Sequence, residues 1–208
     1  MATYSYKFEN DVYRLYEDGQ PMSTQKGHPI ITANEALAQK LVDDLRRGKT
    51  FASDDSLLAY HYTYCNMVAE HTLDELVAHY SESMNYANLI DDCFLMFRQS
   101  APVRQTVAAY FAENASDFFR SMNYYQFAAF VILGTISDSW MFPYYVVSYL
   151  VEQIGQADYD EEKEQFVHDV VQYQSDTLDI DPHSPTYGNH LQHLRKTIDV
   201  FVEYFTME

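Results

Sequence analysis

The fold is decided by the stretch YSYKFENDVYRLYEDG, which occupies residues 4–19. Aromatic residues alternate with polar ones at its start, and a period of two is typical of a β-strand with one buried face. Residues 12–16 predict a second strand. Asp18-Gly19 predicts a hairpin turn, because both residue types tolerate the positive φ of a primed turn. With two further short extended segments, residues 1–31 predict an antiparallel meander that is too small to be stable alone.

Residues 32–48 predict one helix that packs on this meander. Thr32 and Glu35 have the spacing of a capping box, in which the threonine caps the helix and the glutamate reaches back. Leucine and valine then recur at helical spacing on one face. Basic residues follow at the end of this segment, where cations suit the helix dipole, and Gly48 is expected to end the helix.

The rest of the chain is predicted to be helical. The expected helices run over residues 55–70, 72–84, 86–99, 102–113, 116–134, 136–154, 160–177 and 187–205. We expect a domain boundary near residue 50, with a β-meander domain ending in one helix over residues 1–50 and a helical domain over residues 51–208. The fold class is therefore α+β: a small N-terminal antiparallel β domain followed by a larger all-α helical domain.

Charge excludes several classes of partner. The 208 residues include 13 Lys and Arg against 31 Asp and Glu, which gives a net charge of −18. A nucleic-acid-binding protein needs a basic face against phosphates, so we expect no nucleic-acid partner. The same charge disfavours docking on anionic lipid. The N-terminus shows no signal-peptide pattern, so we expect a cytoplasmic protein.

The most hydrophobic segment, residues 124–151, is expected to form two buried helices and not a membrane span. Polar residues and Pro143 interrupt it, whereas a spanning helix needs about 20 mostly apolar residues. Asp138 is expected at the junction of the two helices, because an unpaired acid in an apolar core is costly. Pro143 should kink a helix or begin one.

Few residues form a catalytic pattern, and the sequence contains no nucleotide-binding loop, GxSxG or HExxH motif. His190 and His193 are three residues apart on the last expected helix, so both could face one metal ion, with Asp176 or His183 as a third ligand. Two histidines at this spacing often arise by chance, and we expect surface or hydrogen-bonded side chains.

Two other pairs have simple structural interpretations. Asp91-Asp92 could serve acid–base chemistry, but adjacent acids more often point in different directions. Cys65 and Cys93 are far apart and form no CxxC motif, so we expect buried thiols. We therefore predict a protein that is not an enzyme and has no cofactor and no metal.

A set of motifs near the N-terminus follows a specific order and spacing. Its members are Asp18-Gly19, Pro21, Thr24, Gly27, Pro29 and Leu37-Ala38. Together they resemble the N-terminal signature of the F(1)-ATPase assembly chaperones, which handle the alpha subunit of ATP synthase. Later segments are similar to this family as well: Asn66 with Glu70, Phe97-Arg98 ahead of Pro102, and Tyr173-Gln174-Ser175-Asp176.

The resemblance implies a non-catalytic protein that binds and masks the unassembled alpha subunit of ATP synthase. It implies client contact through Tyr173, Gln174, Asp176 and Arg98. The composition agrees, because 19 Tyr and 8 Met suit a protein interface. The family's motif carries a glutamate where this chain has Asp176, and its later tryptophans are missing. Two alternatives therefore stay open: an interaction protein of the same fold with another partner, and a small metal-dependent enzyme that uses His190 and His193.

Overall fold

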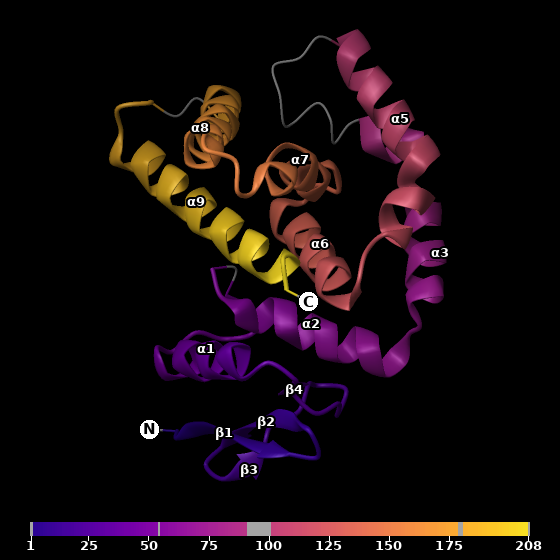
Figure 1. The fold of residues 1–208 in the computed structure, drawn as a ribbon. Helices are drawn as coiled ribbons and strands as arrows, with labels where there is room; N and C mark the ends of the chain where they lie inside the picture. The colour runs from indigo at the N-terminus through magenta and orange to yellow at the C-terminus, as the bar shows by residue number, and fades with distance from the viewer. Residues whose placement is uncertain (1, 54, 91–100, 179–180, 208) are drawn as a thin grey trace.

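The computed structural model describes residues 2–53, 55–90, 101–178 and 181–207, with the backbone alone at 101 and 173–178. In this part of the chain a four-stranded antiparallel sheet precedes the helices, so the expected α+β class is confirmed (Figure 1). The elements are β1 (Tyr4–Glu9), β2 (Val12–Glu17), β3 (Gln20–Pro21), β4 (Ile31–Thr32), α1 (Glu35–Arg46), α2 (Leu57–Glu70), α3 (Leu73–Ser83), α5 (Ala101–Arg120), α6 (Tyr124–Ser137), α7 (Met141–Tyr149), the 3₁₀ helix η1 (Val151–Gln153), α8 (Tyr159–Leu178) and α9 (Pro185–Phe205).

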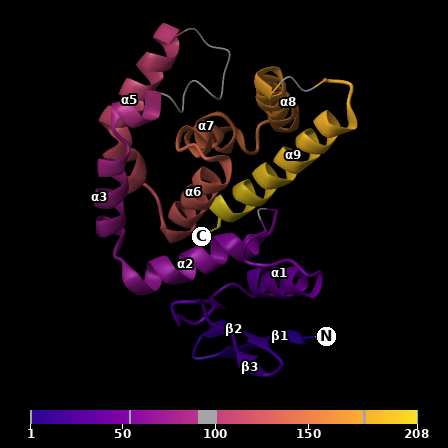
Figure 2. The ribbon, with the colours of Figure 1, turned by 180° about the vertical axis from the view of Figure 1, so that it is seen from behind.

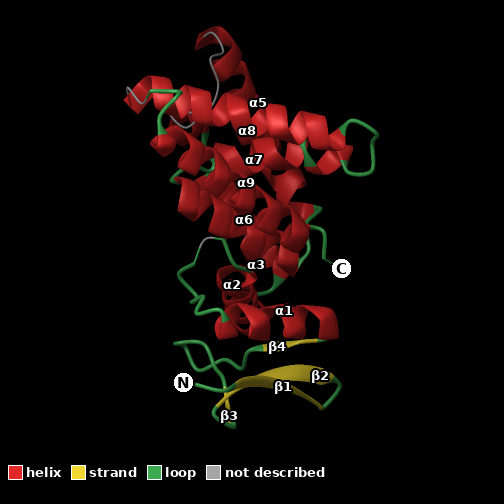
Figure 3. Cartoon of the chain, turned by 90° about the vertical axis from the view of Figure 1, so that its left-hand side faces the viewer, coloured by secondary structure: helices red, strands yellow, loops and turns green. Residues whose placement is uncertain are grey.

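The elements form successive layers. The sheet lies at one end of the molecule, α1 covers it, and α2 lies on the other side of α1 (Figure 3). An ion pair between Lys40 and Glu203 also links α1 directly to α9. Both face-on views place α3 and α5 along one side and α8 and α9 along the other (Figures 1 and 2). The helices therefore spread outward from α2, with α6 and α7 between the two sides.

Strand β2 is the centre of the sheet, since it pairs antiparallel with β1, β3 and β4. Asn10 and Asp11 have φ values of 51° and 64°, and these let a two-residue primed turn join β1 to β2. Asp18 and Gly19, with φ values of 49° and 77°, form the expected second turn. Leu15 of β2 is fully buried under α1 and the loop that precedes β4.

Asn34, and not Thr32, caps α1. The side chain of Asn34 accepts a hydrogen bond of 3.1 Å from a backbone N–H of the first turn. Thr32 is held in β4, where it pairs with Tyr13. Glu35 accepts hydrogen bonds from the hydroxyls of Tyr6 and Tyr13, at 3.4 and 3.2 Å. The expected capping box is wrong because contacts with the sheet engage both of its residues. The expected role of Gly48 is confirmed: α1 ends at Arg46, and Gly48 follows the C-cap residue Arg47 with φ of 81°.

One core runs through the sheet layer and the helices. Buried side chains on either side of residue 50, such as Leu41 of α1 and Leu58 of α2, belong to the same apolar cluster as Phe201 of α9. The domain division at residue 50 stays a prediction. Burial of this continuous core is the main force that holds the meander, which could not fold alone, against the helices.

The expected helix boundary at residues 113–116 is wrong, because it falls inside α5. Ala115 is buried there, and the Asn114 side chain donates to a carbonyl one turn earlier, so the polar residues do not interrupt the helix. α5 ends at Arg120, and the next helix, α6, begins where Asn123 and Gln126 form a complete capping box. Each of these side chains accepts a hydrogen bond of 2.9 Å from the other residue's backbone N–H.

The apolar segment forms two helices, as expected. Asp138 ends α6 in the left-handed region, with φ of 51°, and it is exposed at the junction. The expected start of the next helix at residue 136 is therefore wrong; α7 begins at Met141 and holds Pro143 in its first turn. Among the described residues, no helix combines the length and the apolar character that a bilayer crossing requires.

The helix expected over residues 86–99 is described only in part. Residues 86–90 are helical, and the rest of it, with Asp91-Asp92 and Cys93, lies outside the described residues. Cys65 is a buried free thiol, as expected, and burial raises its pKa to about 11.

Candidate functional site

The client-contact residues expected from the sequence lie at the limits of the described structure. Arg98 lies outside the described residues. Tyr173, Gln174 and Asp176 lie in the last turns of α8, where the backbone alone is described. Their role in client contact therefore stays a prediction.

The histidine pair on α9 lines a small cavity. This cavity has a volume of about 220 Å³, and His190 and His193 share it with Leu133, Ile136, Ser137, Phe142, Leu194 and Thr197. Among the residues that the structure describes, no three His, Cys, Asp or Glu side chains gather closely enough to hold a metal ion. His183, one of the two third ligands considered, does not line the cavity, and the side chain of Asp176 is not described. The pair therefore faces mainly apolar side chains.

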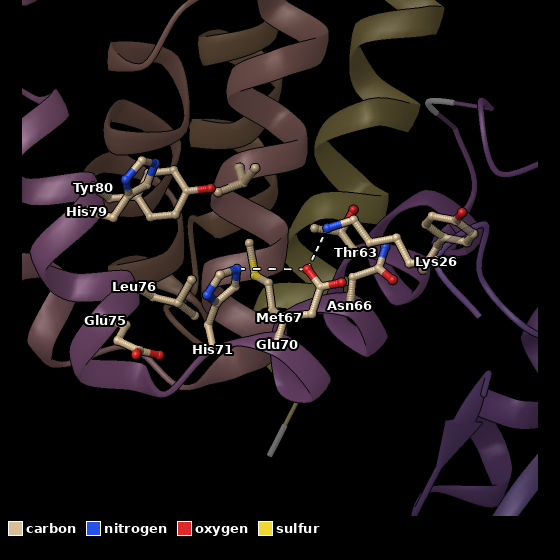
Figure 4. Close-up of a pocket in the computed structure, with 12 residues that line it drawn as sticks. Lys26, Thr63, Asn66, Met67, Glu70, His71, Glu75, Leu76, His79 and Tyr80 are labelled. Carbon is tan, nitrogen blue, oxygen red and sulfur yellow. Dashed lines mark hydrogen bonds and ion pairs between the residues drawn. The ribbon is translucent and has the colours of Figure 1, made fainter. Parts of the chain in front are cut away.

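A larger cavity, of about 450 Å³, lies between α2 and α3 (Figure 4). We call it the α2–α3 pocket. The turn that precedes β4 contributes Lys26, and α6 contributes Val131. Its other lining residues are Tyr62, Thr63, Asn66, Met67, Glu70, His71, Glu75, Leu76, His79 and Tyr80.

Local sequence explains the corner in which this pocket lies. Helix α2 ends at Glu70, and Thr72 caps α3 only two residues later. Thr72 and Glu75 form a complete capping box, with hydrogen bonds of 2.8 and 3.3 Å. Because the cap starts a new helix at once, α2 and α3 meet at a bend (Figure 1). The last turns of α2 and the first turns of α3 line the inside of that bend.

Glu70 is the charged centre of the pocket. Its carboxylate accepts hydrogen bonds from the Lys26 ammonium at 2.5 Å and from the His28 ring at 2.8 Å. His71 Nε2 lies 4.0 Å from the same carboxylate (Figure 4). The hydrogen bonds from Lys26 and His28 hold the pKa of Glu70 below its usual value. These contacts also fix the turn before β4 against the end of α2.

Asn66 provides an unusual polar atom in this pocket. Its Oδ1 is buried and has no hydrogen-bond donor within the described part of the chain. Asn66 and Glu70 are four residues apart on α2, so their side chains lie one above the other on the same helix face. An unpaired amide oxygen, shielded from solvent, therefore lies on the same face of α2 as the Glu70 carboxylate.

Part of the pocket wall is apolar. Met67 of α2 and Leu76 of α3 are buried, and Tyr80 of α3 is partly buried, with a pKa that burial raises. The Tyr80 ring also lies 6.1 Å, between centroids, from the ring of Trp140, the one tryptophan in the sequence. The pocket thus combines an apolar wall with polar groups that converge from α2, as ligand sites commonly do.

Sequence reasoning paired Asn66 with Glu70 but missed the pocket around them. The sequence pattern that could have indicated a site was the i, i+4 spacing of these two polar residues on a mostly apolar helix. Lys26 and His28 are more than 40 residues away in the sequence. Only the packing of the meander on α2 brings them to Glu70, so no local pattern could have found them.

A second surface of interest lies where α5 meets α7. Tyr110 of α5 is 60% exposed and Tyr149 of α7 is 46% exposed, with Tyr144 half-buried near both. We call these three residues the tyrosine surface. The Tyr144 ring stacks on Phe111 with centroids 4.2 Å apart, which fixes α7 against α5. Burial is the main cause that raises the pKa of Tyr144, and the two neighbouring tyrosines raise it further.

Comparisons with models of protein families, with curated proteins and with solved structures found no match for this chain. The resemblance to that family therefore rests on the sequence motifs alone.

Proposed function

We propose that this chain is a non-catalytic, cytoplasmic assembly chaperone that binds and masks the unassembled alpha subunit of ATP synthase. An unassembled subunit exposes an apolar interface larger than a monomer tolerates. The chaperone would cover that interface and then yield to the subunit's proper neighbour. Asp176, Gln174, Tyr173 and Arg98 are proposed to contact the client.

The N-terminal motifs support this family, and three of them have a clear structural role here. Asp18 and Gly19 make the turn between β2 and β3, and Gly27 has a φ of 87° in the turn before β4. Leu37 and Ala38 are fully buried where α1 meets the sheet. The small β region followed by helices is also the architecture that the resemblance implies.

The tyrosine surface is the observation that carries the proposal. Exposed tyrosines offer an apolar ring and a polar hydroxyl, and interfaces are enriched in them. Tyr110 and Tyr149 lie on two helices that Phe111 and Tyr144 hold together, so their positions are set before any client binds. Rigid aromatic side chains lose little conformational entropy on binding, which favours such a surface as an anchor.

Co-expression with the source organism's own alpha subunit, followed by size exclusion, tests the proposal. We expect a one-to-one complex that the double variant Tyr110→Ser, Tyr149→Ser weakens at least tenfold, because buried interface tyrosines often carry more than about 1.4 kcal/mol. Phe8→Ser is the matched control, since Phe8 is 61% exposed but lies on β1, at the far end of the molecule (Figure 1).

Each result has a distinct meaning. A complex that withstands the double variant but fails with Asp176→Lys would assign client contact to the end of α8. A complex that withstands both would keep the function and reject both surfaces. No complex between two folded proteins would reject the proposed client and favour an interaction protein with another partner.

A further inference from the structure

We propose that the α2–α3 pocket binds a guanidinium group, carried by an arginine of a protein partner. This inference does not rest on the client proposed above. It rests on a cavity that brings together a buried acceptor without a donor, a carboxylate whose lysine partner is mostly exposed, and an apolar part of the wall.

The unpaired acceptor is Asn66 Oδ1. A buried oxygen without a donor costs free energy, because it has given up water and gained no partner. A ligand that brings an N–H group to this atom removes that cost. The pocket is therefore expected to favour a ligand that donates hydrogen bonds at the position of Asn66.

The neighbouring carboxylate of Glu70 favours a cation. Its present partners are the Lys26 ammonium, whose side chain is 58% exposed on a surface turn, and the His28 ring. An exposed ion pair of this kind contributes little, so an incoming cation displaces Lys26 at small cost. The Lys26 ammonium donates to Glu70, and Asn66 Oδ1 has no donor with Lys26 in this position.

A guanidinium group matches both acceptors better than an ammonium group. It is planar, carries five N–H donors in a fixed fork, and pairs with a carboxylate through two parallel hydrogen bonds. The guanidinium group then has further N–H donors that can bond to a neighbouring carbonyl oxygen. A ligand of this shape can therefore serve Glu70 and Asn66 together.

The apolar wall and the overall charge fit the rest of an arginine side chain. Met67, Leu76 and Tyr80 line the pocket and can pack against its aliphatic stem. A volume of about 450 Å³ lies within the range of small-ligand sites. The net charge of −18 attracts cations to the molecule as a whole.

Calorimetric titration of the full chain tests this proposal with three ligands. The first is acetyl-Gly-Arg-Gly-amide, the second is the same peptide with neutral citrulline for arginine, and the third is agmatine, a free guanidinium compound. We expect saturable binding of the arginine peptide and at least tenfold weaker binding of the citrulline peptide, because only the former pairs with Glu70 as an ion. Fluorescence of Trp140, next to Tyr80, gives a second readout.

Variants with opposite expected effects separate binding from structural damage. Glu70→Gln should lower the affinity for the arginine peptide at least tenfold, and Asn66→Asp should raise this affinity. Lys26→Met should raise the affinity for the arginine peptide about threefold, because it removes the competing cation. Glu161→Gln, an exposed charge change on α8, should have no effect. Melting curves verify that each variant is folded.

Several results would overturn the proposal: no saturable binding of either guanidinium ligand, equal binding of the citrulline peptide, or affinity unchanged by Glu70→Gln in a folded variant. Agmatine that binds as tightly as the arginine peptide would support the guanidinium site but assign it to a free small molecule. If the chain binds the alpha subunit but the pocket binds no guanidinium ligand, this inference is rejected and the proposed function is kept.

Discussion

His61 of α2 accepts a hydrogen bond from the hydroxyl of Tyr204 of α9, with Nδ1 and the oxygen 2.9 Å apart. The other ring nitrogen, Nε2, donates to the carbonyl oxygen of Ile31 in β4, also at 2.9 Å. Because a carbonyl oxygen only accepts, the proton of the neutral ring lies on Nε2. One buried imidazole thus joins the sheet to two helices that are far apart in the sequence.

This arrangement predicts a loss of stability in mild acid. Burial lowers the pKa of His61 from 6.5 to about 4, although the hydrogen bond with Ile31 opposes the shift. Between these values the unfolded chain binds a proton that the folded chain excludes, so stability falls as the pH falls below 6.5 and the loss is complete below 4. Between pH 7.5 and 5 we expect a loss of about 2 kcal/mol, measured by urea unfolding.

The control is the same measurement on His61→Gln. This variant should be less stable at pH 7.5, because Ile31 or Tyr204 loses a well-placed partner. Its stability should also vary less with pH over the window, since the titrating ring is absent. An unchanged slope in His61→Gln would attribute the acid sensitivity to other histidines.

Tyr204→Phe should destabilise the fold by about 1–3 kcal/mol, because His61 Nδ1 would remain buried without its donor. The ring contacts with Tyr60 and Tyr125, at 5.6 and 5.5 Å between centroids, would persist, so the change isolates the hydroxyl. Chemical unfolding measures the effect. Tyr110→Phe is the control: its exposed hydroxyl should change stability by less than about 0.5 kcal/mol.

Two glycine substitutions in helices should change the stability of the fold in opposite directions. A Cβ atom on Gly134 of α6 would lie 2.7 Å from Trp140 Cε3, so Gly134→Ala should cost about 1–3 kcal/mol and shift the tryptophan fluorescence. A Cβ atom on Gly188 of α9 would meet no atom within 4 Å. Gly188→Ala should therefore stabilise by about 0.5–1 kcal/mol. Melting temperatures that move in the same direction would contradict this reading of the packing.

Asn123→Ala should destabilise the chain by about 1 kcal/mol, because it removes the cap of α6. The Asn123 side chain also donates to the Met207 carbonyl at 3.3 Å, so the variant should loosen the C-terminus. Hydrogen exchange at the C-terminal end of α9 would report this loosening. Asn123→Asp, which keeps the capping oxygen but loses that donor, should retain most of the stability and show the same increase in exchange.

Interactions between sequence neighbours made much of the fold predictable. The turn at Asp18-Gly19 follows from the φ values that these residues tolerate, and the end of α1 at Gly48 follows for the same reason. These features need no distant contact, so their patterns are present in short windows.

Other local patterns were misleading because distant contacts changed their outcome. Thr32 and Glu35 have capping-box spacing, yet pairing with β2 and the tyrosines of the sheet engage them, and Asn34 caps α1. Separate helices were expected over residues 102–113 and 116–134, yet α5 runs through this break with Ala115 buried. In each case a tertiary contact outweighs a local preference of similar or smaller energy.

The candidate sites were least accessible to sequence reasoning. The spacing of Asn66 and Glu70 was visible in α2, but Lys26 reaches Glu70 only because the meander packs against that helix. The hydrogen bonds of His61 to Ile31 and Tyr204 join residues that no short stretch of sequence contains together. Helices and turns follow from neighbours along the chain. The pocket and the buried imidazole depend on segments 30 to 143 residues apart, which only the folded core brings together.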